Sequence, residues 1–173
     1  MSRPYSTALP VTHVVLRILI VLNWLTGAAI LVLLVAMPTR QWIMSALELS
    51  PSAEAERLIM GLRAVAVIGL VTIPLNYAIL KRLLTIVETV RGGEPFVAAN
   101  AYRLRAIAWT LLALQLLSLL IGAIAKALST PARPFDFDAG FSINGWLAVL
   151  LTFVLARVFA EGTLIREDVE GTV

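Results

Sequence analysis

The chain has 173 residues, of which 60% are hydrophobic and only 14% are charged. Soluble domains contain about 45–50% apolar and about 25% charged residues, and one domain of this size cannot hide the excess. An ordinary soluble domain is therefore excluded. The net charge of +3 does not indicate direct binding to nucleic acid, because the basic residues stand mostly at the ends of apolar runs, where they mark membrane topology. The lack of cysteine excludes disulfides and thiolate metal sites.

Four apolar segments predict an all-α fold, an integral membrane bundle of four transmembrane helices. A span needs about 20 mainly apolar residues to cross about 30 Å of hydrocarbon. The expected spans cover residues 18–37, 58–80, 106–125 and 143–160 of a single domain, residues 1–173. Gly27 gives the first helix a smooth patch for close packing, and Pro74 is expected to kink the second.

Polar segments join and follow these spans. The connector at residues 81–105 holds five Lys and Arg residues, and Gly92-Gly93 within it is expected to end the second helix. Ser142 or Asn144 can cap the fourth helix. Residues 161–173 form a polar tail.

The distribution of positive charge predicts the orientation. Four spans put both termini on one side of the membrane, together with the 81–105 connector. That side carries nine Lys and Arg residues: Arg3, Arg17, Lys81, Arg82, Arg91, Arg103, Arg105, Arg157 and Arg166. The other side carries five: Arg40, Arg57, Arg63, Lys126 and Arg133. Because Lys and Arg are enriched in cytoplasmic loops, the excess predicts cytoplasmic termini and a cytoplasmic connector.

Polar residues within the spans are few. Asn23, Asn76 and Gln115 are expected to face the inside of the bundle and to hydrogen-bond between helices. None of the spans carries Asp or Glu in its central part, which weighs against a proton-coupled transporter. The single histidine, His13, has no evident partner and is interpreted as a bystander near the membrane interface.

Arg157 and Glu161 stand one helical turn apart at the inner end of the fourth span. The simplest interpretation is an interfacial ion pair, with the Arg157 side chain extending toward water. The alternative is a clamp from Arg157 to Glu94 or to a cytosolic partner. No nucleotide-binding, nucleophile or zinc-ligand motif occurs, so no catalytic, cofactor or metal residues are assigned and the chain is not expected to be an enzyme.

Two short patterns on the predicted cytoplasmic side resemble a known family. The first is Gly93-x-Pro95-Phe96-Val97 followed by Asn100-x-x-Arg103-Leu104-Arg105. The second is the ending from Glu161, with Ile165-Arg166, the acids Asp168 and Glu170, and a terminal Thr172-Val173. Both are similar to the domain of unknown function 2975 family of small bacterial inner-membrane proteins with four predicted helices. The first helix and the outer loops match only in hydropathy.

The resemblance implies a multi-pass protein of the bacterial inner (plasma) membrane with no established activity, cofactor or catalytic residue to carry over. Members of the family often lie beside genes for small helix-turn-helix transcription regulators. By association, this implies a cytosolic regulator as a partner. The patterns that carry the resemblance lie where such a partner would dock.

The preferred interpretation is therefore a non-enzymatic membrane partner or regulator in the lipid bilayer, which docks a cytosolic regulator or a second copy of itself. The candidate interaction surface comprises Glu94, Pro95, Phe96, Asn100, Arg103, Arg105, Arg157, Glu161, Arg166 and Asp168. The alternative is a small transporter or channel component that acts as an oligomer with a polar lumen. A membrane enzyme ranks third, because no acid–base pair lies within a span.

Overall fold

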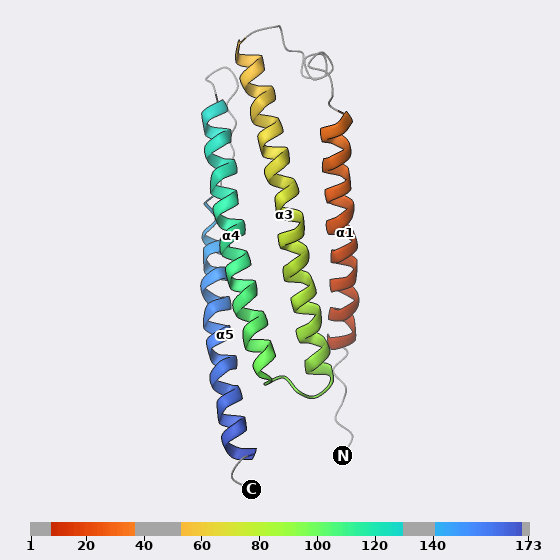
Figure 1. Ribbon diagram of the computed structural model, residues 1–173, viewed down its shortest axis with the longest axis vertical. Helices are drawn as coiled ribbons and strands as arrows, with labels where there is room; N and C mark the ends of the chain where they lie inside the picture. Colours follow the sequence, from red (N-terminus) through yellow and green to blue (C-terminus); the bar gives the residue numbers. More distant parts are fainter. Residues whose placement is uncertain (1–7, 37–52, 130–140, 171–173) are drawn as a thin grey trace.

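The computed structural model describes residues 8–36, 53–129 and 141–170. They form the helices α1 (Ala8–Ala36), α3 (Ala53–Arg91), α4 (Ala98–Leu128) and α5 (Ile143–Glu170), joined in this order (Figure 1). At residues 8, 36, 53, 54 and 166–170 only the backbone is described. The described part of the chain is thus all-helical, as the sequence predicts.

All four helices are long and apolar enough to cross a membrane. The candidate spans are Leu9–Val35, Ala55–Arg91, Ala98–Leu128 and Ile143–Ile165. The helices extend well past the predicted spans: α3 has 39 residues and continues through Pro74. At 1.5 Å per residue its length is about 58 Å, which exceeds the roughly 30 Å of hydrocarbon. These features suit a multi-pass membrane protein whose helices project into the headgroup region.

In Figure 1, α1, α3 and α4 stand side by side, and α5 lies alongside α4, which it overlaps in part of this view. Within the described ranges, α1 packs on α3, α3 on α4 and α4 on α5, and no other pair of helices is in contact. The arrangement is therefore an open row and not a closed bundle with a shared central core. The start of α1, the α3–α4 bend and the end of α5 lie together at one end, called here the basal end (Figure 1).

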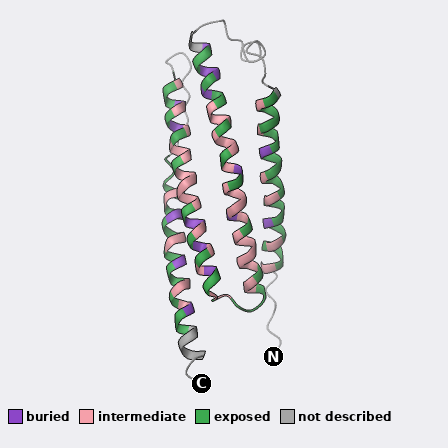
Figure 2. Ribbon diagram, viewed as in Figure 1, coloured by how far each residue is buried: buried purple, intermediate pink, exposed green. Residues whose placement is uncertain are grey.

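Apolar surface covers the outward faces of the row. Exposed positions run along all four helices, and buried ones are few and scattered among them (Figure 2). Many large apolar side chains are exposed, for example Val32, Val67, Leu116 and Leu150. In a water-soluble protein such an area would be a binding or aggregation surface, whereas here it suits contact with lipid tails.

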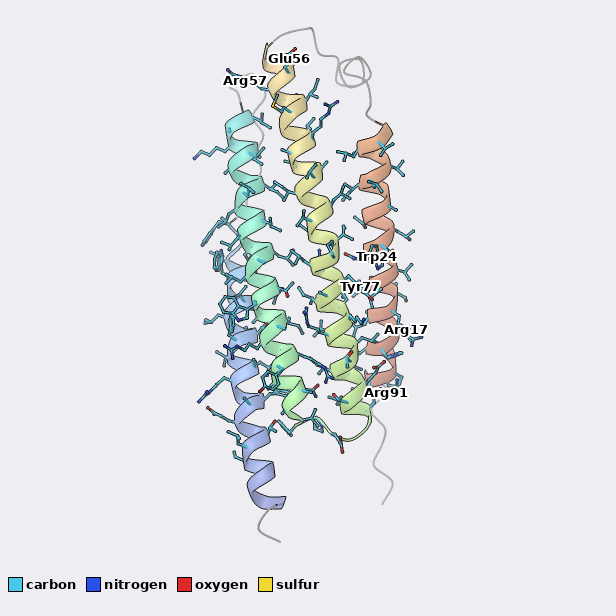
Figure 3. The ribbon with its side chains drawn as sticks, viewed as in Figure 1. Arg17, Trp24, Glu56, Arg57, Tyr77 and Arg91 are labelled. Atoms are coloured by element: carbon cyan, nitrogen blue, oxygen red, sulfur yellow. The ribbon has the colours of Figure 1, made fainter. Side chains whose placement is uncertain are left out.

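A glycine and an asparagine on one face of α1 form the seam with α3. A Cβ atom at Gly27 would lie 3.0 Å from Cγ2 of Ile73, so the two helices approach closely there. One turn earlier, Asn23 Nδ2 donates a hydrogen bond to the Ile73 carbonyl at 3.1 Å. The Trp24 and Tyr77 rings pack with centroids 5.5 Å apart (Figure 3). The close approach expected at Gly27 is thus present, and the Asn23 hydrogen bond to α3 stabilises it.

The seam between α4 and α5 uses a glycine in a similar way. Ser142 Oγ accepts a hydrogen bond from the Gly145 backbone N–H at 3.1 Å, so the predicted cap of this helix is Ser142. The side chain of Gln115 lies where a Cβ at Gly145 would stand. Further toward the basal end, Trp109 meets Phe153 edge-on at 5.3 Å. These contacts fix the antiparallel register of the two helices.

Candidate functional site

The chain reverses direction at the basal end through a glycine turn. Helix α3 ends at Arg91, as Gly92-Gly93 predicts. Gly93 has φ +83°, a left-handed conformation that favours glycine. The N–H of Gly93 donates to the Val90 carbonyl and the N–H of Glu94 to the Thr89 carbonyl, each at 3.1 Å. This pattern satisfies the last carbonyls of the helix and sends the chain back toward α4.

Asn100 joins the two sides of this bend. Its side-chain amide donates to Thr89 Oγ1 at 2.8 Å and to the Pro95 carbonyl at 2.9 Å. Its Oδ1 accepts from Arg103 Nη1 at 2.7 Å. The residue is 0% exposed. One buried amide therefore links the end of α3, the connecting loop and the first turns of α4, which fixes the shape of the bend.

The bend in turn packs against the basal end of α5. The Phe96 ring lies 5.4 Å from the ring of Phe159, measured between centroids. A Cβ at Gly162 would lie 3.0 Å from Phe96 Cδ1, so the ring sits directly over this glycine. The sequence predicted that the connector and the tail share one side of the membrane, and that Arg103 or Arg105 could pair with Glu167, Asp168 or Glu170, whose side chains lie outside the described residues. The structure packs the connector against the last turns of α5.

The connector, the start of α4 and the basal part of α5 also carry exposed charged groups. Arg157 Nε donates to Glu161 Oε1 at 2.7 Å, and their side chains are 78% and 56% exposed. The i,i+4 ion pair expected from the sequence is present, and Arg157 is not paired with Glu94. Arg105 and Glu94 are also exposed. These four charged residues and the 43% exposed Phe96 are called the bend surface below.

Several residues expected on an interaction surface lie elsewhere. Asn100 is enclosed by its own chain and presents no exposed atoms for docking, which corrects the prediction for this residue. Pro95 and Arg103 are half-buried, and both are engaged by Asn100. The side chains of Arg166 and Asp168 lie outside the described residues.

The three intramembrane amides also differ from one another. Asn23 makes the interhelical bond that was expected of all three. Asn76 and Gln115 are half-buried, and neither makes a hydrogen bond within the part of the chain that the structure describes. Gln115 is instead packed against the backbone of α5 at Gly145.

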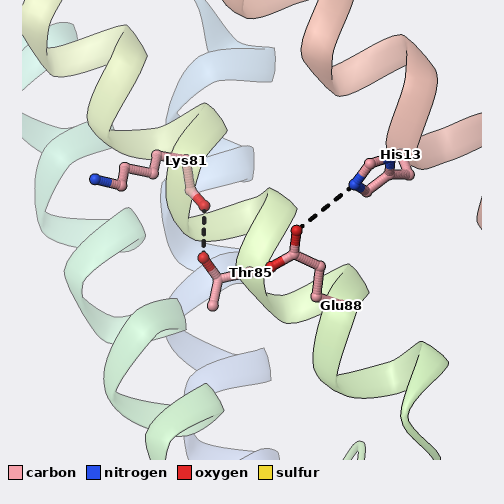
Figure 4. A network of polar contacts seen from close by, with 4 residues as sticks. All are labelled: His13, Lys81, Thr85 and Glu88. Atoms are coloured by element: carbon pink, nitrogen blue, oxygen red, sulfur yellow. Dashed lines mark hydrogen bonds and ion pairs between the residues drawn. The ribbon is translucent and has the colours of Figure 1, made fainter.

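His13 has a partner that the sequence did not reveal. Its Nε2 lies 3.6 Å from Glu88 Oε1, so the start of α1 meets the last turns of α3 (Figure 4). The neighbouring Thr85 hydroxyl donates to the Lys81 carbonyl within α3 at 3.0 Å. The sequence could not name this neighbour, because it comes from a distant helix, and the interpretation of His13 as a bystander near the interface stays a prediction. Among the described residues, no group of three or more His, Asp and Glu side chains could hold a metal ion.

Comparison with known proteins gives one match. The family described as "Protein of unknown function (DUF2975)" matches residues 41–173. No curated protein and no solved structure matches the chain. The family match spans α3, the bend, α4 and α5, and it begins after α1. Since the match extends over more than half of the sequence, and the bend patterns lie within it, the chain belongs to the DUF2975 family.

Proposed function

We propose that this protein is a non-enzymatic partner or regulator in the bacterial inner membrane that docks a cytosolic protein through the bend surface. Both termini and the bend face the cytoplasm in this proposal, because nine of the fourteen Lys and Arg residues stand on that side. The family's association with helix-turn-helix regulators makes such a regulator the preferred partner. A second copy of the chain is the other candidate.

The packing of Phe96 on Phe159 and Gly162 carries the proposal. It makes two separate segments into one surface of fixed shape, and the buried Asn100 holds that shape from behind. Arg105, Arg157, Glu94 and Glu161 give this surface both signs of charge around an aromatic ring. Arg and aromatic residues are enriched at protein interfaces. Exposed ion pairs contribute only about 0–1 kcal/mol each, so they exchange readily for contacts to a partner.

Photocrosslinking tests the proposal directly in cells. A photoreactive amino acid is placed at Phe96 or at Tyr102, which is 72% exposed one turn beyond Ala98. The matched control is Met60, which is 71% exposed near the opposite end of α3. We expect one soluble protein, identified by mass spectrometry, to be attached at the basal positions and not at residue 60. Absence of any soluble adduct, or the same adducts at all three positions, would refute the docking proposal.

The alternative function is an oligomeric transporter or channel component. Two observations favour it: the row of helices is open at α1 and α5, and the half-buried Asn76 and Gln115 make no hydrogen bonds among the described residues. Additional copies could close the row and bring such amides to a lumen. The mass of the protein in a lipid nanodisc decides this point. A ring of several copies with ion or solute flux in vesicles supports the alternative, whereas a monomer excludes it.

A further inference from the structure

A groove lies between α4 and α5 toward the basal end, and it shares Arg105 and Arg157 with the bend surface. Its volume is about 540 Å³, within the range of small-molecule sites in proteins. Its lining includes the small side chains of Ala101, Ala156 and Ala160 together with Arg105 from α4 and Arg157 from α5. We infer that this groove binds an anionic phospholipid, with the phosphate at the two arginines and an acyl chain along the alanines. This inference goes beyond the docking of a protein and does not depend on it.

The register of the two helices brings the arginines to one level. Phe96 packs on Phe159, and Trp109 packs on Phe153, so α4 and α5 run antiparallel with these pairs opposed. Between these contacts Arg105 comes level with Arg157. Two guanidinium groups on opposite sides of one groove suit a phosphate, because arginine presents a fixed fork of donors that matches phosphate oxygens.

Both arginines have hydrogen-bonding capacity left. Arg105 has no ionic or hydrogen-bonded partner among the described side chains. Arg157 uses its Nε atom for Glu161, and its two terminal nitrogens bond to no other described residue. The lining of the groove carries Arg105 and Arg157 and no carboxylate, which complements an anionic headgroup, whereas Glu94 and Glu161 of the bend surface lie outside that lining. Glu161 competes with the headgroup for Arg157. Removal of the Glu161 charge should therefore strengthen the binding of an anionic lipid.

The groove also lies at the depth where lipid phosphates occur. On α5 no charged residue occurs from Ile143 to Ala156, a stretch of about 21 Å at 1.5 Å per residue, so Arg157 falls near the edge of the hydrocarbon. On α4 the 56% exposed Trp109 stands one turn from Arg105, and tryptophan prefers the membrane interface. Basic pockets between transmembrane helices at this level are suited to anionic headgroups.

Native mass spectrometry of the purified full chain tests the inference. The detergent-solubilised protein is titrated with phosphatidylglycerol or phosphatidylcholine that carry the same acyl chains. We expect tighter binding of phosphatidylglycerol. Arg105→Gln and Arg157→Gln should each weaken it about fivefold, since one basic residue near an anionic lipid is worth about this factor. The matched control pair, Arg63→Gln with Lys126→Gln, lies toward the other end of the helices and should change binding less than twofold.

Two further variants separate charge from shape. Glu161→Gln frees Arg157 and should tighten phosphatidylglycerol binding, while Ala160→Leu fills the groove and should weaken binding without changing the charge. Circular dichroism of each variant checks that its helix content is retained. Equal binding of both lipids, or equal losses in the groove and control variants, would overturn the inference. Full competition by glycerol 3-phosphate, which lacks acyl chains, would also overturn it. So would groove variants that change the oligomeric mass of the protein but retain as much lipid as the parent chain.

Discussion

Removal of the Asn100 side chain should loosen the bend more than any exposed substitution there. Asn100→Ala deletes the hydrogen bonds to Thr89 and Pro95 and the bond from Arg103. A neutral hydrogen bond contributes about 0.5–1.5 kcal/mol net, and one to a charged group about 1.5–3 kcal/mol. The expected loss is therefore about 2.5–6 kcal/mol of unfolding free energy, a large share of a typical total of about 5–15 kcal/mol.

Asn100→Asp distinguishes hydrogen bonding from volume. It keeps nearly the same size and can still accept from Arg103. However, a carboxylate has no N–H to donate to the Pro95 carbonyl, and it places negative charge against that carbonyl oxygen. We expect it to be destabilised despite the new ion pair with Arg103. The matched control is Asn144→Ala, because Asn144 is exposed at the start of α5 and should change stability by less than about 0.5 kcal/mol.

Equilibrium unfolding in mixed micelles with a rising fraction of sodium dodecyl sulfate, followed by tryptophan fluorescence, measures these differences. Trypsin provides a local readout at Arg91 and Arg103, which border the bend. Both sites should be cleaved faster in Asn100→Ala than in the parent chain. If Asn100→Ala loses less than 1 kcal/mol, or matches Asn144→Ala in both assays, the amide does not hold the bend together and the reasoning fails.

Two further predictions concern the α1–α3 seam and the orientation. Gly27→Leu pushes atoms into Ile73, which a Cβ alone would approach to 3.0 Å. It should lower the unfolding free energy by about 1–3 kcal/mol in the same assay. The control Ala28→Leu, at an exposed position, should be nearly neutral, and equal effects of the two substitutions would contradict the packing. Because the chain has no cysteine, Glu94→Cys and Lys126→Cys can be labelled without background by a membrane-impermeant maleimide. Intact spheroplasts should label only the Lys126→Cys variant, and the reverse pattern would invert the proposed topology.

The sequence was most informative where a structural rule is local. Helix α3 ends at Arg91 because Gly93 can adopt a positive φ, and the Ser142 cap depends on neighbouring residues alone. The Arg157–Glu161 pair likewise follows from helical spacing. Each of these features is fixed within a few residues, so a pattern of residue types is enough to predict it.

Features that depend on which helices are neighbours could not be predicted. Asn100 was placed on an exposed surface because it stands in a polar segment, yet it is buried by the bend itself. His13 lacked a partner in the sequence because Glu88 belongs to another helix. Hydropathy alone does not determine which apolar helices become neighbours, because the spans contain few polar residues that would favour one arrangement over another. The open row is therefore a property of the fold that span prediction cannot reach.

In the open row, α1 is separate from the helices that build the bend surface and the α4–α5 groove. Since α1 contacts only α3 and α5 contacts only α4, the bend surface and the α4–α5 groove are built entirely without α1. The family match begins at residue 41, after α1, and includes every residue of that surface and groove. Helix α1 is joined to α3 by Asn23, Gly27 and His13 along a single seam. Substitutions in that seam should therefore detach α1 while leaving the packing of the bend and of the α4–α5 groove intact.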